Sequence, residues 1–516
     1  MEHKRSAGIL LHPTSLPGRY GIGDLGKEAY HFIDFLVSAG QTIWQVLPMG
    51  PTGYGDSPYQ CFSAFAGNPL LINPDLLKER GFLNEEDLND FPNYDVHRVD
   101  FGSIIPQKYD LLRKAFEIAL NNGIDIEEES KDFFDENNFW LEDYSLFMAV
   151  KNYHGGILWT EWDEAIAFRK PGAVDEWKVK LAKEIKFQKF LQYTFFEQWN
   201  NLKKYANSKG ISIIGDIPIF IAYDSADLWA NRELFTVDNK GKLETVAGVP
   251  PDYFSPTGQL WGNPLYKWEV MEKNGFAWWL SRIKQMLKLV DVIRIDHFRG
   301  MQAFYEIPGG SETAQHGRWM LAPGKKLFET VKEKIGELPI LAEDLGIITK
   351  EVRDLRDSFG FPGMRIMQFA FGCGGEKRFL PHNFEKNTVV YTGSHDNDTT
   401  RAFFEKEKAD NTEVYQHAQK YFDYYGDDLR MELIKAAYHS VANLVIIPMQ
   451  DILNLGSDAR MNFPGVQNGN WQWRFTWDQV HHDLAAQYNE LVKLTERSSY
   501  VKPEEEIKIV YGEYLK

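Results

Sequence analysis

The stretch DVIRIDH, at residues 291–297, is a short apolar run that ends in charged residues. Seven further stretches have the same form, at residues 7–12, 42–48, 211–220, 339–344, 364–371, 389–396 and 444–451. Most are rich in Ile, Val and Leu without strict alternation, which is typical of parallel strands buried on both faces. The sequence therefore predicts eight buried parallel strands.

Amphipathic stretches separate many of these strands. Residues 27–39 (KEAYHFIDFLVSA) place their large apolar side chains on one side, and Gly40 follows as a stop signal. Residues 278–289 and 327–335 behave likewise. Strands that alternate with helices predict the α/β class and a (β/α)₈ TIM barrel.

Two gaps between predicted strands are too long for simple crossovers. Residues 50–210 follow the second strand and contain helical patterns at 107–121 and 175–208, so a largely helical insertion is expected there. Residues 222–288 follow the third strand and are expected to supply active-site loops and helices. No Pro-, Ser- or Gly-rich linker interrupts the chain, which predicts one catalytic domain over residues 1–516.

The C-terminal part is short. After Asp451 the sequence offers one loop, a helical stretch at 478–495 and a tail that ends at Lys516. We therefore expect no C-terminal β domain.

The composition excludes several classes of protein. The chain has 516 residues, with 57 Lys and Arg against 74 Asp and Glu, and its net charge of −17 repels a nucleic-acid backbone. Its two cysteines, Cys61 and Cys373, cannot form a disulfide framework. No signal peptide or membrane span is recognised, since Pro13 ends the first apolar run, so the expected location is the cytoplasm. Aromatic residues make up 14%, which fits either a large core or a cleft that stacks flat ligands.

Residues 21–26 (GIGDLG) match the dinucleotide-binding pattern G-x-G-x-x-G and precede a predicted helix. The tight strand-to-helix turn of that motif is missing, because Pro13, Pro17 and Gly18 lie in between. A plain turn, or a loop beside the cleft, is the better interpretation.

Carboxylates at strand ends are the strongest chemical signal. Asp296, Glu343 and Asp396 each end a predicted strand, as do acids at 216, 344 and 451. Any one of them could be a helix N-cap, but the strand ends of a barrel converge on one rim. Arg294 shares a strand face with Asp296 and would favour its ionised form.

An array of acids suits glycoside chemistry. A retaining mechanism pairs a carboxylate nucleophile with a carboxylic acid roughly 5 Å away, and the charged partner keeps the donor protonated. A divalent-metal site is the rival use of clustered acids. The sequence has no H-E-x-x-H, paired C-x-x-C or EF-hand loop, so no metal and no cofactor are expected.

Long motifs around these acids resemble the 4-α-glucanotransferases, or amylomaltases and disproportionating enzymes, of glycoside hydrolase family 77. They are VIRIDHFRG, LAEDLG, YTGSHDNDTT, GPTGYGDSPYQ (50–60), GDIPIFIAYDSADLW (215–229), GVPPDYFSPTGQLWGNPLY (248–266) and DARMNFPG (458–465). The resemblance covers nearly the whole chain and implies the barrel fold. Asp216 is followed by Ile-Pro-Ile-Phe rather than the Asn-His pair usual in related amylases, which favours family 77 over those hydrolases.

The resemblance also implies roles. Asp296 would be the nucleophile, Glu343 the acid and base, and Asp396 a group that binds the reacting sugar and favours its distorted form. Tyr59 and Trp261 would stack on sugar faces, while the part of Tyr54 stays open. The remaining substrate-binding residues by this match are Ser57, Asp216, Asp252, Gln259, Arg294, His395 and Asn462.

The implied activity is transfer of an α-1,4-glucan segment to the 4-hydroxyl of another glucan or of glucose. The expected partners are malto-oligosaccharides, starch and glycogen, with no nucleic acid and no membrane, and the chain would be a monomer or a homodimer. Two alternatives remain, a hydrolytic α-glucosidase or α-amylase and a catalytically inactive glucan-binding barrel.

Overall fold

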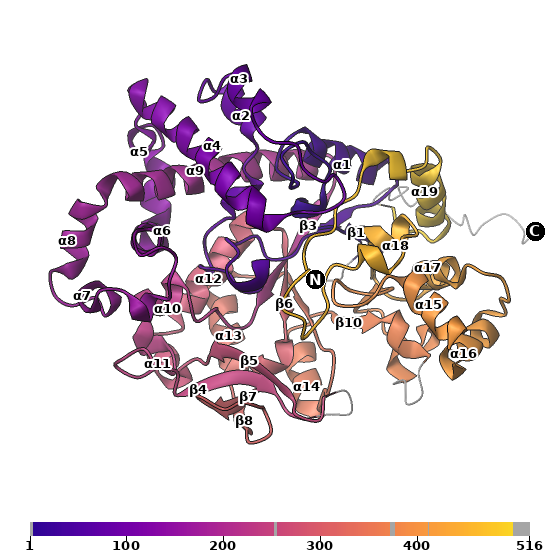
Figure 1. The fold of residues 1–516 in the computed structure, drawn as a ribbon. Helices are drawn as coiled ribbons and strands as arrows, with labels where there is room; N and C mark the ends of the chain where they lie inside the picture. The colour runs from indigo at the N-terminus through magenta and orange to yellow at the C-terminus, as the bar shows by residue number, and fades with distance from the viewer. Residues whose placement is uncertain (1–3, 252–254, 372–376, 411, 499–516) are drawn as a thin grey trace, which may run out of the picture.

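The computed structural model describes residues 4–251, 255–371, 377–410 and 412–498 (Figure 1). Within these residues eight parallel strands form a closed barrel in the order β1-β12-β11-β10-β9-β6-β3-β2. Their bounds are β1 Ser6–Leu10, β2 Ile43–Gln45, β3 Ser212–Pro218, β6 Val292–Asp296, β9 Ile340–Ala342, β10 Gly363–Ile366, β11 Thr388–Tyr391 and β12 Leu444–Pro448. Each overlaps one of the eight predicted stretches, and the predicted (β/α)₈ barrel is confirmed.

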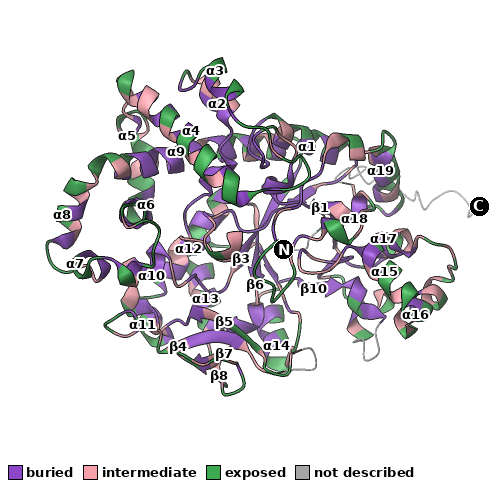
Figure 2. Ribbon diagram, viewed as in Figure 1, coloured by how far each residue is buried: buried purple, intermediate pink, exposed green. Residues whose placement is uncertain are grey.

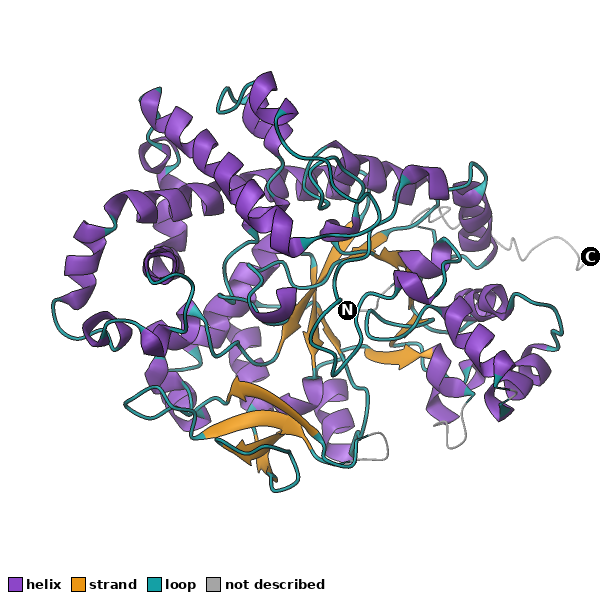
Figure 3. Cartoon of the chain, in the orientation of Figure 1, coloured by secondary structure: helices purple, strands orange, loops and turns teal. Residues whose placement is uncertain are grey.

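The barrel strands are buried because helices cover them from outside (Figures 2 and 3). Every residue of β10, β11 and β12 is buried, which explains why these strands read as unbroken apolar runs. The predicted helices at 27–39, 278–289 and 327–335 correspond to α1, α12 and α13. The bounds in this part are α1 Lys27–Ser38, α12 Ala277–Leu289, α13 Gly324–Ile335, α14 Lys350–Ser358, α15 Thr400–Ala409, α16 Glu413–Phe422, α17 Leu429–His439, α18 Met449–Ile452 and α19 Leu484–Leu494.

The segment between β2 and β3 is mainly helical and occupies the upper left of Figure 1. Its helices are α2 Pro74–Glu79, α3 Glu85–Asn89, α4 Phe101–Asn121, α5 Ile126–Glu129, α6 Lys131–Tyr153, α7 Glu164–Ala167, α8 Ala173–Lys180 and α9 Ala182–Ser208. Helix α4 begins earlier than predicted, since Asp100 caps it by accepting a hydrogen bond from Ser103 N. The helix predicted at 175–208 is divided in two at Leu181, whose φ of −111° is not helical.

The segment between β3 and β6 contains helices α10 Ala226–Ala230 and α11 Trp268–Lys273 and, unlike the expectation of loops and helices, two strands. These strands, β4 Thr245–Val249 and β5 Gln259–Pro264, join β7 Ala303–Pro308 and β8 Arg318–Leu321 in an antiparallel sheet of order β5-β4-β7-β8. The sheet lies at the bottom of Figure 3. The sequence gave no clear signal for it because these strands are short and β8 is largely exposed.

The chain after β12 turns into α18 and α19, and its described residues, 449–498, contain no β-strand. This agrees with the expected lack of a C-terminal β domain. Among the described residues, no helix combines the length and the apolar composition needed to span a bilayer.

The glycine-rich stretch at 21–26 is a packed turn in front of α1. A Cβ atom on Gly23 would lie 2.0 Å from the carbonyl oxygen of Pro13, and one on Gly26 would lie 2.1 Å from Asn73 Nδ2. Asp24 Oδ1 accepts hydrogen bonds from Gly26 N and Asn73 Nδ2. Close packing against neighbouring protein atoms therefore accounts for these glycines.

Candidate active site

Asp296 and Glu343 follow the register of two neighbouring barrel strands. In the β6–β9 pair Ile295 lies opposite Ala342, and Glu343 N donates to Ile295 O at 3.1 Å. The next residue on each strand is an acid, so Asp296 and Glu343 are brought side by side at the carboxyl ends of the strands. In TIM barrels this end carries the active site.

Arg294 holds Asp296 from inside the barrel. Its guanidinium is buried, with Nη1 at 3.0 Å from Asp296 Oδ1, and the same nitrogen bonds to Asp216 Oδ2 on β3. The two carboxylates raise the pKa of Arg294, although burial alone would lower it. Arg294 is therefore a permanent cation that favours the charged form of Asp296.

Asp216 lies beneath the two reacting acids rather than in contact with solvent. It is 1% exposed, and its Oδ2 accepts a 2.7 Å hydrogen bond from Tyr59 Oη as well as the bond from Arg294. Burial and the charge of Asp296 raise its pKa to about 6. A direct contact between Asp216 and substrate stays a prediction; what the structure describes is a link from Tyr59 to Arg294.

Glu343 has no cation of its own. Its Oε2 accepts a hydrogen bond from His297 N at 2.7 Å, and its Oε1 accepts one from Leu345 N at 2.8 Å. Burial, followed by the nearby charge of Asp296, raises its pKa to about 8, against the opposing effects of Arg294 and the two amides. Glu343 is therefore protonated at neutral pH, whereas Arg294 keeps its partner Asp296 charged. The pair has the protonation states of an acid and a nucleophile.

Asp396 comes from the loop after β11 and opens toward solvent. Its side chain is 47% exposed, and Oδ1 accepts a 2.7 Å hydrogen bond from Asn462 Nδ2. His395 Nε2 lies 3.4 Å from the same oxygen, and Arg460 donates to the Asp396 carbonyl. Asn462, predicted to bind a sugar hydroxyl, thus already positions Asp396.

The predicted aromatic platforms frame the acids. Tyr59 stacks on His395 with ring centroids 5.1 Å apart and an interplanar angle of 18°. Trp261, on β5, meets His297 edge-on at 4.8 Å, and its Nε1 donates to Gln259 Oε1 at 3.1 Å. Tyr59 is thereby joined to the Asp396 loop and Trp261 to the end of β6.

The other predicted residues are less closely tied to the acids. Ser57 Oγ accepts a hydrogen bond from Tyr59 N at 3.2 Å, so it orders the Tyr59 turn. Gln259 is exposed and Tyr54 is 69% exposed. Asp252 lies outside the described residues.

Two residues at the site were not singled out from the sequence. His297 directly follows the predicted nucleophile, and Trp471 packs 5.8 Å from Tyr59 and 5.9 Å from His395. The place of His297 in the DVIRIDH stretch was a usable signal. For Trp471 the only signal was an aromatic cluster, Trp471 and Trp473, shortly after the motif at 458–465.

Two other strand-end acids stabilise the fold instead. Asp344 accepts hydrogen bonds from Arg356 Nη1 at 2.5 Å and from Met364 N at 2.7 Å. Asp451 accepts bonds from Thr392 Oγ1 and from the backbone and hydroxyl of Thr400. Among the described residues, no group of three or more His, Cys, Asp and Glu side chains is arranged to hold a metal ion.

Comparisons with known proteins agree with this geometry. The model of a family described as 4-alpha-glucanotransferase matches residues 11–480. A 4-alpha-glucanotransferase of Synechocystis is 48% identical over 97% of this chain and 99% of its own, and one of Thermus thermophilus is 49% identical over 96% and 100%. The chloroplastic/amyloplastic enzyme of Solanum tuberosum is 43% identical over 95% of this chain and 85% of its own.

Solved structures give the same result. An amylomaltase from Streptococcus agalactiae, in complex with acarbose, superposes with a TM-score of 0.92 at 40% identity and covers 96% of this chain and all of its own. An amylomaltase from Corynebacterium glutamicum shares the fold at a TM-score of 0.76 and 17% identity, over 96% of this chain and 75% of its own. The chain belongs to glycoside hydrolase family 77, the 4-α-glucanotransferases, enzymes that act on glucans.

Proposed function

We propose that this chain transfers α-1,4-glucan segments with retention of anomeric configuration, through a covalent β-glucosyl-enzyme on Asp296. The observation that carries this proposal is the pair formed by Asp296, bound to Arg294, and Glu343, which is buried with a pKa of about 8. One partner is charged and the other protonated at the same pH, as double displacement requires.

In the first step an Asp296 carboxylate oxygen attacks the anomeric carbon of the donor glucan. The bond from that carbon to the leaving 4-oxygen breaks, its electron pair goes to the oxygen, and the Glu343 proton is transferred there. Glu343 is left as a carboxylate, which its hydrogen bonds from His297 N and Leu345 N stabilise.

In the second step the 4-hydroxyl of an acceptor attacks the same carbon from the opposite side. Glu343 now takes the hydroxyl proton, the bond to Asp296 breaks, and Asp296 leaves as a carboxylate. Arg294 stabilises that leaving carboxylate. Two inversions give net retention.

The residues around the pair would bind and distort the reacting sugar. Asp396, held by Asn462 and half open to solvent, is suited to accept two adjacent hydroxyls, beside His395. Tyr59 and Trp261 offer ring edges and faces to the apolar sides of sugars. Ser57, Gln259, Asn462 and Asp252 are proposed to bind acceptor hydroxyls, and Asp216 to act through Arg294 and Tyr59.

Transfer rather than hydrolysis requires a sugar to outcompete water at the covalent intermediate. The inserted segment after β2 and the antiparallel sheet are proposed to supply walls that bind the acceptor and exclude water. Malto-oligosaccharides, starch and glycogen are the proposed substrates, in line with relatives that carry the name 4-alpha-glucanotransferase.

Incubation with maltotriose alone tests the proposal. We expect glucose together with longer oligomers, at a constant number of reducing ends, since each cleaved bond is replaced by a new one. The Asp296→Asn variant is the matched control and should form neither product. A steady rise in reducing ends would identify a hydrolase instead, and an unchanged rate in Asp296→Asn would refute the catalytic assignment.

A further inference from the structure

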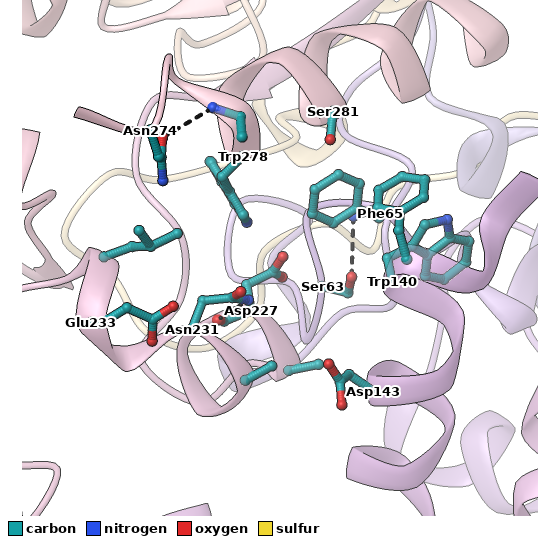
Figure 4. A pocket seen from close by; sticks show the side chains of 15 residues that line it. Ser63, Phe65, Trp140, Asp143, Asp227, Asn231, Glu233, Asn274, Trp278 and Ser281 are labelled. Atoms are coloured by element: carbon teal, nitrogen blue, oxygen red, sulfur yellow. Dashed lines mark hydrogen bonds between the residues drawn. The ribbon is translucent and has the colours of Figure 1, made fainter. Parts of the chain in front are cut away.

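A cavity of about 270 Å³ lies away from the reacting acids, between α6, α10 and the start of α12 (Figure 4). Fifteen described residues line it, and its wall is of two kinds. Aromatic rings come from Phe65, Phe139, Trp140 and Trp278, and polar groups include Asp143, Asp227, Asn231, Glu233 and Asn274. The volume is near the lower end of that of small-molecule sites, about 300–1,000 Å³.

Trp278 provides an unused hydrogen-bond donor in this cavity. Its side chain is 7% exposed, and among the described residues its Nε1 has no hydrogen-bond partner. In Figure 4 the nitrogen end of the ring points into the cavity, on the side of Asp227. Buried donors of this kind are almost always satisfied, so an acceptor atom is missing from the cavity.

The polar wall restricts what that acceptor belongs to. Of the described lining residues none is Lys or Arg, while three are acidic, which disfavours an anion. A simple ammonium ion would satisfy the acids but could not accept a hydrogen bond from Trp278. A hydroxyl group does both, since it donates to a carboxylate and accepts from an indole N–H.

The aromatic wall narrows the ligand to a sugar. Phe139 is 53% exposed at the cavity and meets Phe65 edge-on at 5.5 Å, and Phe65 in turn meets Trp278 at 5.7 Å. An exposed ring next to buried rings and acceptors suits a molecule with apolar C–H faces and peripheral hydroxyls. A glucosyl ring has this surface.

The cavity is connected to the active site through one loop. Ser63 and Phe65 also line a smaller cavity, of about 50 Å³, together with Tyr59 and Asp216. Asp227, 5% exposed, accepts a hydrogen bond from Ala64 N and so fixes this loop. A ligand at Asp227 would therefore contact the same loop that carries Tyr59.

We propose that this cavity is a second glucan-binding site, which holds a glucosyl unit of a long α-glucan while another part of the polymer occupies the catalytic groove. The proposal rests on the proposed function only for the identity of the sugar. Its consequence is selective, because long glucans reach both sites and maltotriose reaches one.

Three variants test the proposal. Phe139→Ala removes an exposed ring, Trp278→Phe removes the unused donor, and Tyr425→Ala is the control, since Tyr425 is a 69% exposed aromatic residue that does not line the cavity. We expect the first two to weaken retention in amylose-containing native gels and to raise KM for amylose by about threefold to tenfold. The KM for maltotriose, kcat and the control should not change.

Crystals soaked in maltohexaose provide the direct measurement, with density expected against Trp278 and Asp227. Density confined to the catalytic groove, or equal KM changes for amylose and maltotriose, would overturn the second site. Unchanged amylose binding in Phe139→Ala, which cannot fail through misfolding of a buried core, would do the same. A wild-type protein that binds amylose in this cavity but does not disproportionate maltotriose would instead refute the proposed function alone.

Discussion

Glu343 and Asp344 are consecutive acids at the end of one strand, yet they face two different regions. Glu343 faces the catalytic rim, where its nearest charge is Asp296 and its hydrogen bonds come from backbone amides. Asp344 faces the layer behind, where Arg356 bonds to it and Arg365 lies 3.6 Å away. Both are buried, but one has a like charge for a neighbour and the other has two cations.

The difference shows how a barrel separates chemistry from stability. Neighbouring residues of a strand point to opposite faces, so adjacent acids enter unrelated environments. A buried carboxylate with a cation stabilises the fold once both are in place, whereas a buried carboxyl beside a like charge retains its proton. The catalytic rim is thus expected to be sensitive in rate, and the layer behind it in stability.

The largest effect should come from the catalytic rim. Asp296→Asn removes the nucleophile and Glu343→Gln removes the transferable proton, and each should lower kcat for maltotriose disproportionation by at least about 10⁴-fold. Circular dichroism and the melting temperature should remain close to those of the wild type. Glu337→Gln, at an exposed position, is the control and should keep full activity. A loss of folding in place of a loss of rate would break the comparison.

The reverse result is expected behind the rim. Asp344→Asn leaves Arg356 buried without its partner and should lower the free energy of unfolding by about 3–5 kcal/mol in urea titrations. The specific activity of the folded fraction should change little. Asp354→Asn breaks the exposed pair with Lys350 on α14 and should cost less than about 1 kcal/mol. Equal losses in both variants would contradict the role given to the buried pair.

Arg294→Lys sharpens the comparison within the rim. Lysine keeps the positive charge but cannot reproduce the guanidinium geometry that serves Asp216 and Asp296 together. We expect kcat to fall by about 10²-fold with a small change in KM, measured on maltotriose. An unaltered kcat would show that charge alone is sufficient.

The smallest effect expected is that of pH. Only protonated Glu343 can act as the acid, so kcat/KM should fall by about tenfold per pH unit above its pKa of about 8. The sign for stability is the same, because the folded protein binds this proton more tightly than the unfolded chain. The stabilisation is complete below the ordinary value of 4.5 and is lost as pH rises through about 8.

Glu343→Gln separates these two effects. It should raise the melting temperature at pH 8 relative to the wild type while abolishing turnover, as scanning calorimetry would measure. A wild-type activity profile that is flat up to pH 10 would rule out Glu343 as the titrating acid.

The barrel could be predicted because each of its strands is a local apolar run, as in β12, where every residue is buried. The antiparallel sheet could not, since β8 exposes most of its residues and Trp319 is itself 39% exposed. Strands of this kind are defined by their partners rather than by their own pattern.

The site divides along the same line. The acids Asp296, Glu343 and Asp396 were visible as strand ends, and their separate roles came from family resemblance. The contacts that distinguish them were not visible, because Asn462 reaches Asp396 across 66 residues and Tyr59 reaches Asp216 across 157. For the same reason the sequence did not show that Asp344, next to Glu343, belongs to Arg356.

His297 has a consequence for how the enzyme tolerates motion. Its backbone is left-handed, with φ of 54°, directly after Asp296, and its N–H is bonded to Glu343. One peptide unit and one hydrogen bond therefore connect the two reacting carboxyl groups, on strands already joined through Ile295 O. Bending of the barrel rim displaces both groups together and leaves their separation nearly constant. Whatever movement of the inserted segments admits a long polymer, the spacing on which catalysis depends is set within a single strand pair.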